Sequence, residues 1–220
     1  MGRLKFGPYG PLIGKLGNVV NYIWRGMNVN RMVPHKTTKP ASIKQLASRK
    51  QFSMAQKFVA PIGEFVSFSF HPETKGKPKI PQNAASSLFR KHAIKGEYPD
   101  YWVDYSEVIM SKGDLPKPKN AAVTRDGELL TFTWEVDTNL SYKRNSDQVM
   151  LMAYLPDTME ASFIAGGVSR TTGTAVLEFY PELRPEEWRK RDTVVETYIA
   201  FISNDRQQVS DSVYTGPIIL

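Results

Sequence analysis

Seven short β-prone segments, the clearest of which alternate apolar and polar residues, fill the last hundred residues of this chain, and this pattern constrains the fold most. The alternation is clearest at Leu130, Phe132, Trp134 and Val136. Turn sequences rich in Gly, Asn, Asp and Pro separate the segments, and short strands spaced by such turns are typical of a β-sandwich. The predicted strands are 120–125, 129–136, 147–155, 159–165, 173–180, 193–203 and 208–215, with a further strand over 101–111.

Two aromatic residues refine this prediction. Trp134 lies early in the series of strands, and Tyr198 lies on the penultimate strand. They are placed like the core aromatic residues of immunoglobulin-like and fibronectin type III sandwiches. We therefore expect an immunoglobulin/fibronectin-III-like β-sandwich. This is an expectation about fold, and it carries no specific function.

The first hundred residues predict a different, α+β region. Two β-prone runs, 18–24 and 27–33, flank a two-residue Arg25-Gly26 link, which predicts a β-hairpin. Helices are expected over 42–59, with Phe52 on the apolar face, and over 83–94. Segment 64–70 fits either a strand or a continuing helix, and 71–81 is expected to be a loop. The fold class is thus mainly β: an N-terminal β-hairpin plus two helices, then the sandwich.

Charge divides the chain in the same way. The first acidic residue is Glu64, and eleven Lys or Arg precede it. Up to Lys119 there are 20 basic and 7 acidic residues, whereas the remainder has 9 basic and 15 acidic ones. Segment 111–120 contains two Pro and one Gly, which is typical of a stiff linker. We therefore expect a basic N-terminal region, 1–115, and a sandwich domain, 116–220.

No pattern in the sequence indicates catalysis. The chain has no Cys, which excludes disulfides and thiolate chemistry. Its three histidines, His35, His71 and His92, lack metal-ligand spacing, and no nucleophile elbow is present. The segment Gly10–Lys15 has the wrong spacing for a phosphate-binding loop. We therefore expect no enzymatic activity, no catalytic or metal-binding residues and no cofactor.

Cellular location is constrained only weakly. No apolar run is long enough for a transmembrane segment. The opening residues lack the apolar region of a Sec signal peptide, so we expect a cytoplasmic protein or one released by a non-Sec route.

Cations interleaved with aromatic residues make the N-terminal region a candidate binding surface. Such a surface suits an acidic protein face or nucleic acid, where charge follows phosphates and rings stack on bases. The acidic C-terminal half of another copy is one such face, so self-association into a filament or particle is the leading hypothesis. Nucleic-acid binding is the alternative, and a glycan- or protein-binding sandwich, with Trp188 as a possible platform, is a third. The candidate contact residues are Val19, Val20, Tyr22, Ile23, Trp24, Arg25 and Arg31.

Spaced elements over nearly the full length resemble a known sequence family. The opening elements are Gly14–Val20 (GKLGNVV), Trp24-x-Gly26, Arg31 and Arg49-x-x-Phe52; the later ones are Tyr98-Pro-Asp100, Val108–Gly113 and Val209–Tyr214. Together they resemble an uncharacterised family of Bacteroidota proteins. That family has no established activity, so the resemblance implies no functional residues. Its opening pattern is also similar to segments of phage-like and other particle-forming proteins, which favours a structural role.

Overall fold

The computed structural model describes residues 2–3, 11–35, 38–137, 142–179 and 193–219. Internal contacts divide the chain into two compact units, Met1–Ile43 and Lys44–Leu220, which are described in turn. The domain boundary expected at 115/116 does not coincide with this break in contacts. Whether residues 1–115 and 116–220 fold as separate domains stays a prediction.

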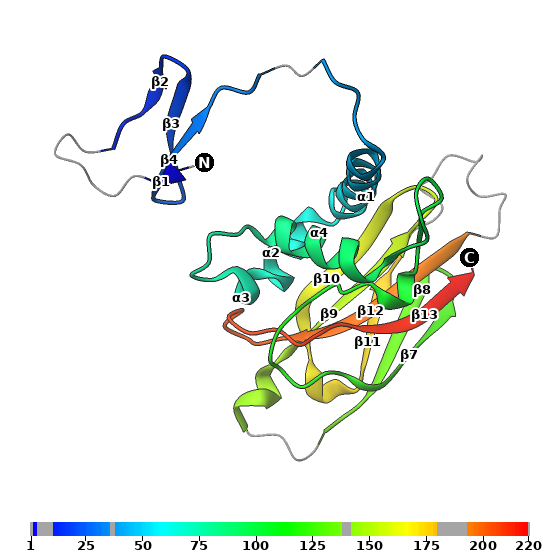
Figure 1. Ribbon diagram of the computed structural model, residues 1–220. Helices are drawn as coiled ribbons and strands as arrows, with labels where there is room; N and C mark the ends of the chain where they lie inside the picture. Colours follow the sequence, from blue (N-terminus) through cyan, green and yellow to red (C-terminus); the bar gives the residue numbers. More distant parts are fainter. Residues whose placement is uncertain (1, 4–10, 36–37, 138–141, 180–192, 220) are drawn as a thin grey trace. The chain divides into compact units, whose positions relative to one another are not determined.

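The N-terminal unit is a small antiparallel sheet. Its strands are β1 (Gly2–Arg3), β2 (Gly14–Leu16), β3 (Val19–Trp24) and β4 (Met27–Met32), in the order β1-β4-β3-β2 (Figure 1). Arg25 and Gly26 join β3 to β4 with φ values of 48° and 76°. Positive φ at both central residues is the geometry of a type I′ turn, whose twist matches that of the flanking strands. The predicted hairpin is confirmed.

The second unit contains a β-sandwich of two antiparallel sheets. One sheet has the order β10-β9-β12-β13, and the other has the order β11-β8-β7. These seven strands confirm the predicted sandwich. Their bounds are β7 Lys119–Asp126, β8 Leu129–Glu135, β9 Gln148–Leu155, β10 Glu160–Ser169, β11 Thr174–Glu178, β12 Val194–Ile202 and β13 Val213–Ile219.

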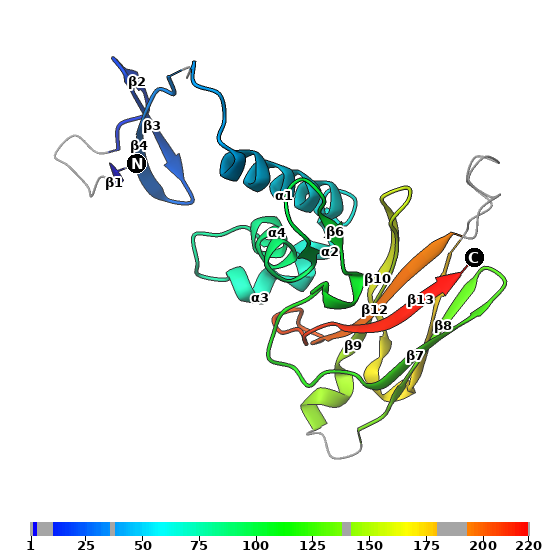
Figure 2. The same cartoon turned by 45° about the vertical axis from the view of Figure 1, so that its right-hand side comes forward.

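Helices form a third layer on the four-stranded sheet (Figures 1 and 2). They are α1 (Ile43–Val59), α2 (Gly63–Ser69), α3 (His71–Thr74) and α4 (Pro81–His92). The two predicted helices are present, and 64–70 resolves as helix because Phe65, Val66, Ser69 and Phe70 are buried at helical spacing. The expected loop 71–81 begins with the short α3.

The central strands β9 and β12 are therefore buried on both faces. Between the helices and the sheet, Phe58 stacks on Phe89 with ring centroids 4.2 Å apart and contacts Tyr154 at 4.8 Å. Between the two sheets, Trp134 meets Phe201 edge-on at 6.0 Å. Every residue of β9 after Gln148 is consequently buried, which explains why this strand reads as an unbroken apolar run.

Tyr198 corrects one expectation. Its side chain lies in the helix-side core and not between the two sheets, and its hydroxyl donates to the Tyr105 carbonyl at 2.8 Å. Neighbouring residues of a strand point to opposite faces, so Ile199 takes the inward place. Trp134 does lie between the sheets, where its Nε1 donates to the Arg170 carbonyl at 2.8 Å.

Two further segments differ from the sequence-based expectation. Segment 101–111 contains only β6 (Trp102–Val103), paired with β5 (Ile94–Lys95), and a 3₁₀ turn at Tyr105–Glu107. The Asp104 side chain accepts from the Ser106 amide at 3.2 Å, and this local bond turns the chain out of an extended course.

The segment expected as a linker, 111–120, is bonded to the loop between β12 and β13. Ser111 Oγ donates to the Ser210 carbonyl at 2.7 Å, and the Leu115 amide donates to the Val209 carbonyl at 3.0 Å. The Asp211 carboxylate accepts from the Gly113 amide at 3.1 Å. Segment 111–120 is therefore packed against the sandwich and does not act as a free connection.

Candidate functional site

The pairing register of β3 with β4 sorts the seven predicted contact residues onto two faces and a turn. Val20 pairs with Arg31, Tyr22 with Val29, and Trp24 with Met27, so these six share one face. The Arg31 guanidinium lies 5.8 Å from the centre of the Tyr22 ring, which is a cation–π contact. Lys15 joins this cation–aromatic face through its pairing with Val20.

The opposite face of the small sheet carries apolar and amide side chains. Val19 pairs with both Leu16 and Met32, and Ile23 pairs with Asn28. Asn21 anchors this face, because its Nδ2 donates to the Gly14 carbonyl at 3.3 Å. Arg25 lies in the turn. The structure thus brings Val20, Tyr22, Trp24 and Arg31 together and places Val19 and Ile23 behind them.

Very little of this unit is buried. Among its described residues only Asn21 and Val29 are buried. A sheet needs a hydrophobic face packed against something for independent stability. Large apolar side chains are nevertheless exposed throughout this unit: Leu12, Ile13, Leu16, Ile23, Trp24, Met32 and Ile43.

The N-terminal unit also carries the whole net charge of the chain. Residues 1–43 contain seven of the 29 Lys and Arg and none of the 22 Asp and Glu. Residues 44–220 therefore contain 22 of each sign and are neutral. The basic helical part predicted from the sequence lies in the same unit as the acidic strands, so the +7 belongs to the small sheet and its flanking residues.

None of the described α-helices packs on the outer face of the three-stranded sheet of the sandwich. Alternation places Leu130, Phe132 and Trp134 inward, and Leu129, Thr131 and Thr133 outward. At one end of this face, Leu129 pairs with Asp126 on one side and with Glu178 on the other. The helices lie on the other sheet (Figure 2). An exposed apolar residue is thus flanked by two carboxylates.

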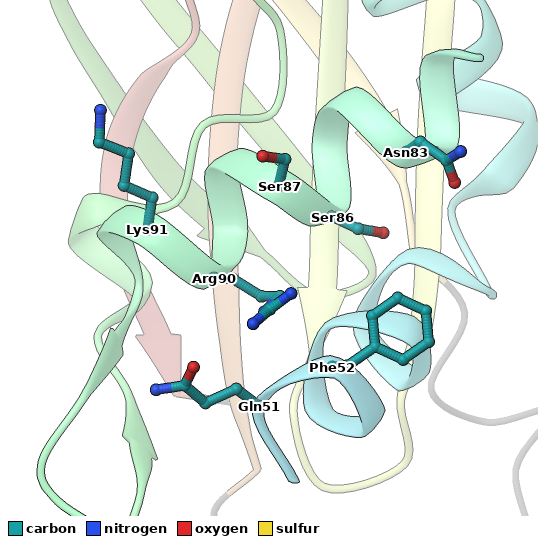
Figure 3. Close-up of a pocket in the computed structure, with 7 residues that line it drawn as sticks. All are labelled: Gln51, Phe52, Asn83, Ser86, Ser87, Arg90 and Lys91. Atoms are coloured by element: carbon teal, nitrogen blue, oxygen red, sulfur yellow. The ribbon is translucent and has the colours of Figure 1, made fainter. Parts of the chain in front are cut away.

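A cavity of about 550 Å³ lies between α1 and α4, and sequence reasoning missed it. Figure 3 shows its lining: Gln51, Phe52, Asn83, Ser86, Ser87, Arg90 and Lys91. Phe52 was expected on the inward face of α1, yet its side chain is 52% exposed. The inward places are taken by Ala55, Phe58 and Val59. The sequence does contain one signal for this cavity, because neither α1 nor α4 has an acidic residue.

The histidines and Trp188 are the remaining candidate residues from the sequence. His71 is exposed at the start of α3, and His92 ends α4. Across the described part of the chain, no group of His, Asp and Glu side chains could hold a metal ion. No helix built from described residues is long and apolar enough to cross a membrane. Trp188, the expected glycan platform, lies outside the described residues.

Comparison with known proteins agrees with one part of the resemblance in the sequence, namely that the family has no established activity. No curated protein matches the chain. One family model does match, over residues 11–216, and so covers most of both units. The chain therefore belongs to a family of unknown function, DUF6266.

Proposed function

We propose that this chain is a non-enzymatic structural protein that associates with copies of itself, as a subunit of a filament or particle. One observation carries the proposal. The unit 1–43 holds a charge of +7 and many exposed apolar side chains, and it buries only two described residues. A small sheet with this composition gains stability when a partner covers a face and neutralises its cations.

The partner we propose is the outer face of the three-stranded sheet in another copy. That face carries no α-helix among the residues that the structure describes, and it presents Leu129 between Asp126 and Glu178. Trp24 and Val20 would supply apolar contact, and Arg25 and Arg31 would meet the carboxylates. Opposite charges that face each other across an interface set its register and raise the rate of association.

A contact of this kind joins two different surfaces of the same chain. Such a heterologous contact builds rings where the rotation closes and open filaments where it does not. A copy that is bound through its acidic face still has its own N-terminal sheet available to bind another copy. Assembly would therefore continue as the protein concentration rises.

Charge reversal provides the test. The double variant Arg25→Glu/Arg31→Glu should abolish the concentration-dependent growth in mass that light scattering measures at low salt. The matched control is Lys44→Glu/Lys57→Glu, which removes equal charge from exposed positions on α1. Adding Asp126→Lys/Glu178→Lys to the first variant should restore assembly, and negative-stain microscopy would then show its products.

The proposal is contradicted by either of two results. One is an intact protein that stays a monomer at high concentration and low salt. The other is an Arg25→Glu/Arg31→Glu variant that assembles as well as the parent does.

Nucleic-acid binding is the second candidate, and the cation–aromatic face favours it. Lys15 and Arg31 lie beside Tyr22 and Trp24 on one face of the sheet. Fluorescence anisotropy with a labelled single-stranded oligonucleotide would test it. Binding should weaken steeply with salt as counterions are released, and Trp24→Ala should weaken it at every salt concentration. Absence of binding at low salt excludes this candidate.

The narrower family assignment also belongs to the proposal. We propose that relatives come from Bacteroidota and share the opening pattern of Gly14–Val20 followed by Trp24-x-Gly26 and Arg31. The match to one family model over residues 11–216 supports a common ancestry for both units.

A further inference from the structure

Two arginines with partly or wholly buried guanidinium groups differ in how well these groups are hydrogen-bonded. Arg170 pairs with Asp147 at 3.4 Å, reaches the Pro116 carbonyl and covers the Phe201 ring. Arg90, on α4, makes one long hydrogen bond, from Nη2 to Ser48 Oγ at 3.4 Å. Its Nε is buried and has no hydrogen-bond partner among the described residues. A buried donor left in this state is costly, and a charged one more so.

Nε and Nη2 of Arg90 are the atoms with which an arginine side chain binds an oxyanion in bidentate fashion. Nε and Nη2 form one edge of the guanidinium plane, and two parallel N–H groups on such an edge match the two oxygens of a carboxylate or a phosphate. From the residues described, Nε receives no hydrogen-bond partner and Nη2 receives only the long bond to a neutral hydroxyl. Arg90 lines the cavity, so a rotation of its side chain would bring both groups to an anion bound there.

No carboxylate from the described part of the chain lines this cavity. Neither α1 nor α4 contains an Asp or a Glu, and none of the seven lining residues is acidic. Lys91 adds a second cation at the rim. Figure 3 shows the Arg90 guanidinium reaching from α4 towards Gln51 and Phe52 on α1, with the Lys91 ammonium pointing away from it. The electrostatic field in the cavity therefore favours an anion.

The remaining lining indicates a flat ring attached to that anion. The Phe52 ring is half-exposed at the cavity, where a planar group can stack on it. Asn83, Ser87 and Gln51 offer neutral donors and acceptors for ring or sugar substituents. A volume of about 550 Å³ lies within the range of small-molecule sites and admits a molecule of this size.

We propose that the cavity between α1 and α4 binds a small aromatic phosphate, such as a nucleoside monophosphate, with Arg90 on the phosphate and Phe52 against the ring. The site is independent of the N-terminal sheet, because every lining residue belongs to the second unit. The self-association proposed above can fail without affecting this proposal, and the reverse also holds.

Titration calorimetry on the full chain tests the site, with adenosine 5′-monophosphate as the probe. Saturable one-to-one binding is expected. Adenosine, which lacks the charge, and inorganic phosphate, which lacks the ring, should each bind at least about tenfold more weakly, since each loses one of the two contacts. Equal affinity for inorganic phosphate and for the monophosphate would overturn the role of the ring.

Three variants complete the experiment. Arg90→Gln should weaken monophosphate binding at least about tenfold, because it removes charge-assisted hydrogen bonds. Phe52→Leu should weaken the monophosphate and leave inorganic phosphate unchanged. Arg49→Gln removes the same charge from an exposed position on α1 that does not line the cavity, and it should bind as the parent does.

The folding of each variant is checked by its thermal midpoint. Absence of saturable binding to the folded parent overturns the proposal, as does a folded Arg90→Gln variant with parental affinity. A folded Phe52→Leu variant that keeps parental affinity for the monophosphate overturns the assignment of the ring contact.

Discussion

Arg170 Nη1 lies 3.4 Å from Asp147 Oδ2, and the two residues are 4% and 1% exposed. The pair links the start of β9 to the end of β10, because the Arg170 amide also donates to the Asp147 carbonyl at 2.8 Å. Burial raises the pKa of the Asp147 carboxyl, although Arg144 and Arg170 act against this shift. Burial also lowers the pKa of Arg170, so loss of solvation outweighs the attraction for both groups.

Removing one member of this pair should strongly destabilise the fold. Asp147→Ala leaves a buried cation without its partner, which costs about 3–5 kcal/mol in the free energy of unfolding. Urea denaturation measures this loss. Asp157→Ala, at an exposed carboxylate, is the matched control and should change stability by less than about 0.5 kcal/mol. A variant Asp147→Ala as stable as that control would show that the pair contributes nothing.

Alkaline pH should unfold the helix-side core. Burial, followed by the charges of Glu196 and Asp157, raises the pKa of Tyr105 to about 12, and burial also raises the pKa of Tyr154 and Tyr198. A phenol whose pKa is raised by folding contributes stability that is complete below its unfolded value of 10.0. This stability is lost as the pH rises from 10 towards 12, the value for Tyr105.

Tyrosinate absorbance and circular dichroism, recorded together, check the alkaline transition. The buried tyrosines should ionise together with the loss of secondary structure. The expectation fails if all ten tyrosines of the chain titrate together near their ordinary pKa while the fold persists.

The turn of the N-terminal hairpin can be improved by one substitution. Arg25 has φ of 48°, a left-handed conformation that Asn adopts more readily than Arg. Arg25→Asn creates an Asn-Gly type I′ turn and should stabilise the hairpin by about 0.5 kcal/mol. Amide hydrogen exchange in β3 and β4 should slow by roughly twofold. Gly26→Ala, at φ 76°, should accelerate it. Faster exchange in Arg25→Asn would contradict this reading of the turn.

Gly113 lies where segment 111–120 packs on the sandwich. A Cβ added there would clash with the carbonyl oxygen of Val209. Gly113→Ala should therefore lower the free energy of unfolding by about 1–3 kcal/mol. Gly63→Ala is the matched control, since it has open space in α2, and it should raise stability by about 0.5–1 kcal/mol. Equal midpoints for the two variants in chemical denaturation would refute the close packing.

Patterns local in sequence determined the hairpin, the helices over 43–59 and 81–92, and the first six sandwich strands, whereas the last strand, predicted over 208–215, lies at Val213–Ile219. These elements depend on residue alternation, turn chemistry and helical spacing, which neighbours along the chain decide. The pairing of the contact residues between 19 and 31 could also be predicted from the sequence, because a two-residue turn sets the register of β3 on β4. The sequence alone therefore determined which residues share the cation–aromatic face.

Long-range packing decided the rest. Helices placed on the outer face of β9 and β12 bury both sides of these strands, so Tyr198 belongs to the helix-side core and segment 111–120 to the sandwich. The crossing of α1 and α4 leaves Phe52 exposed, and it leaves Arg90 Nε with no hydrogen-bond partner in the described part of the chain. No local pattern encodes these outcomes, because the free energy of burying a side chain depends on surfaces that come from distant parts of the chain.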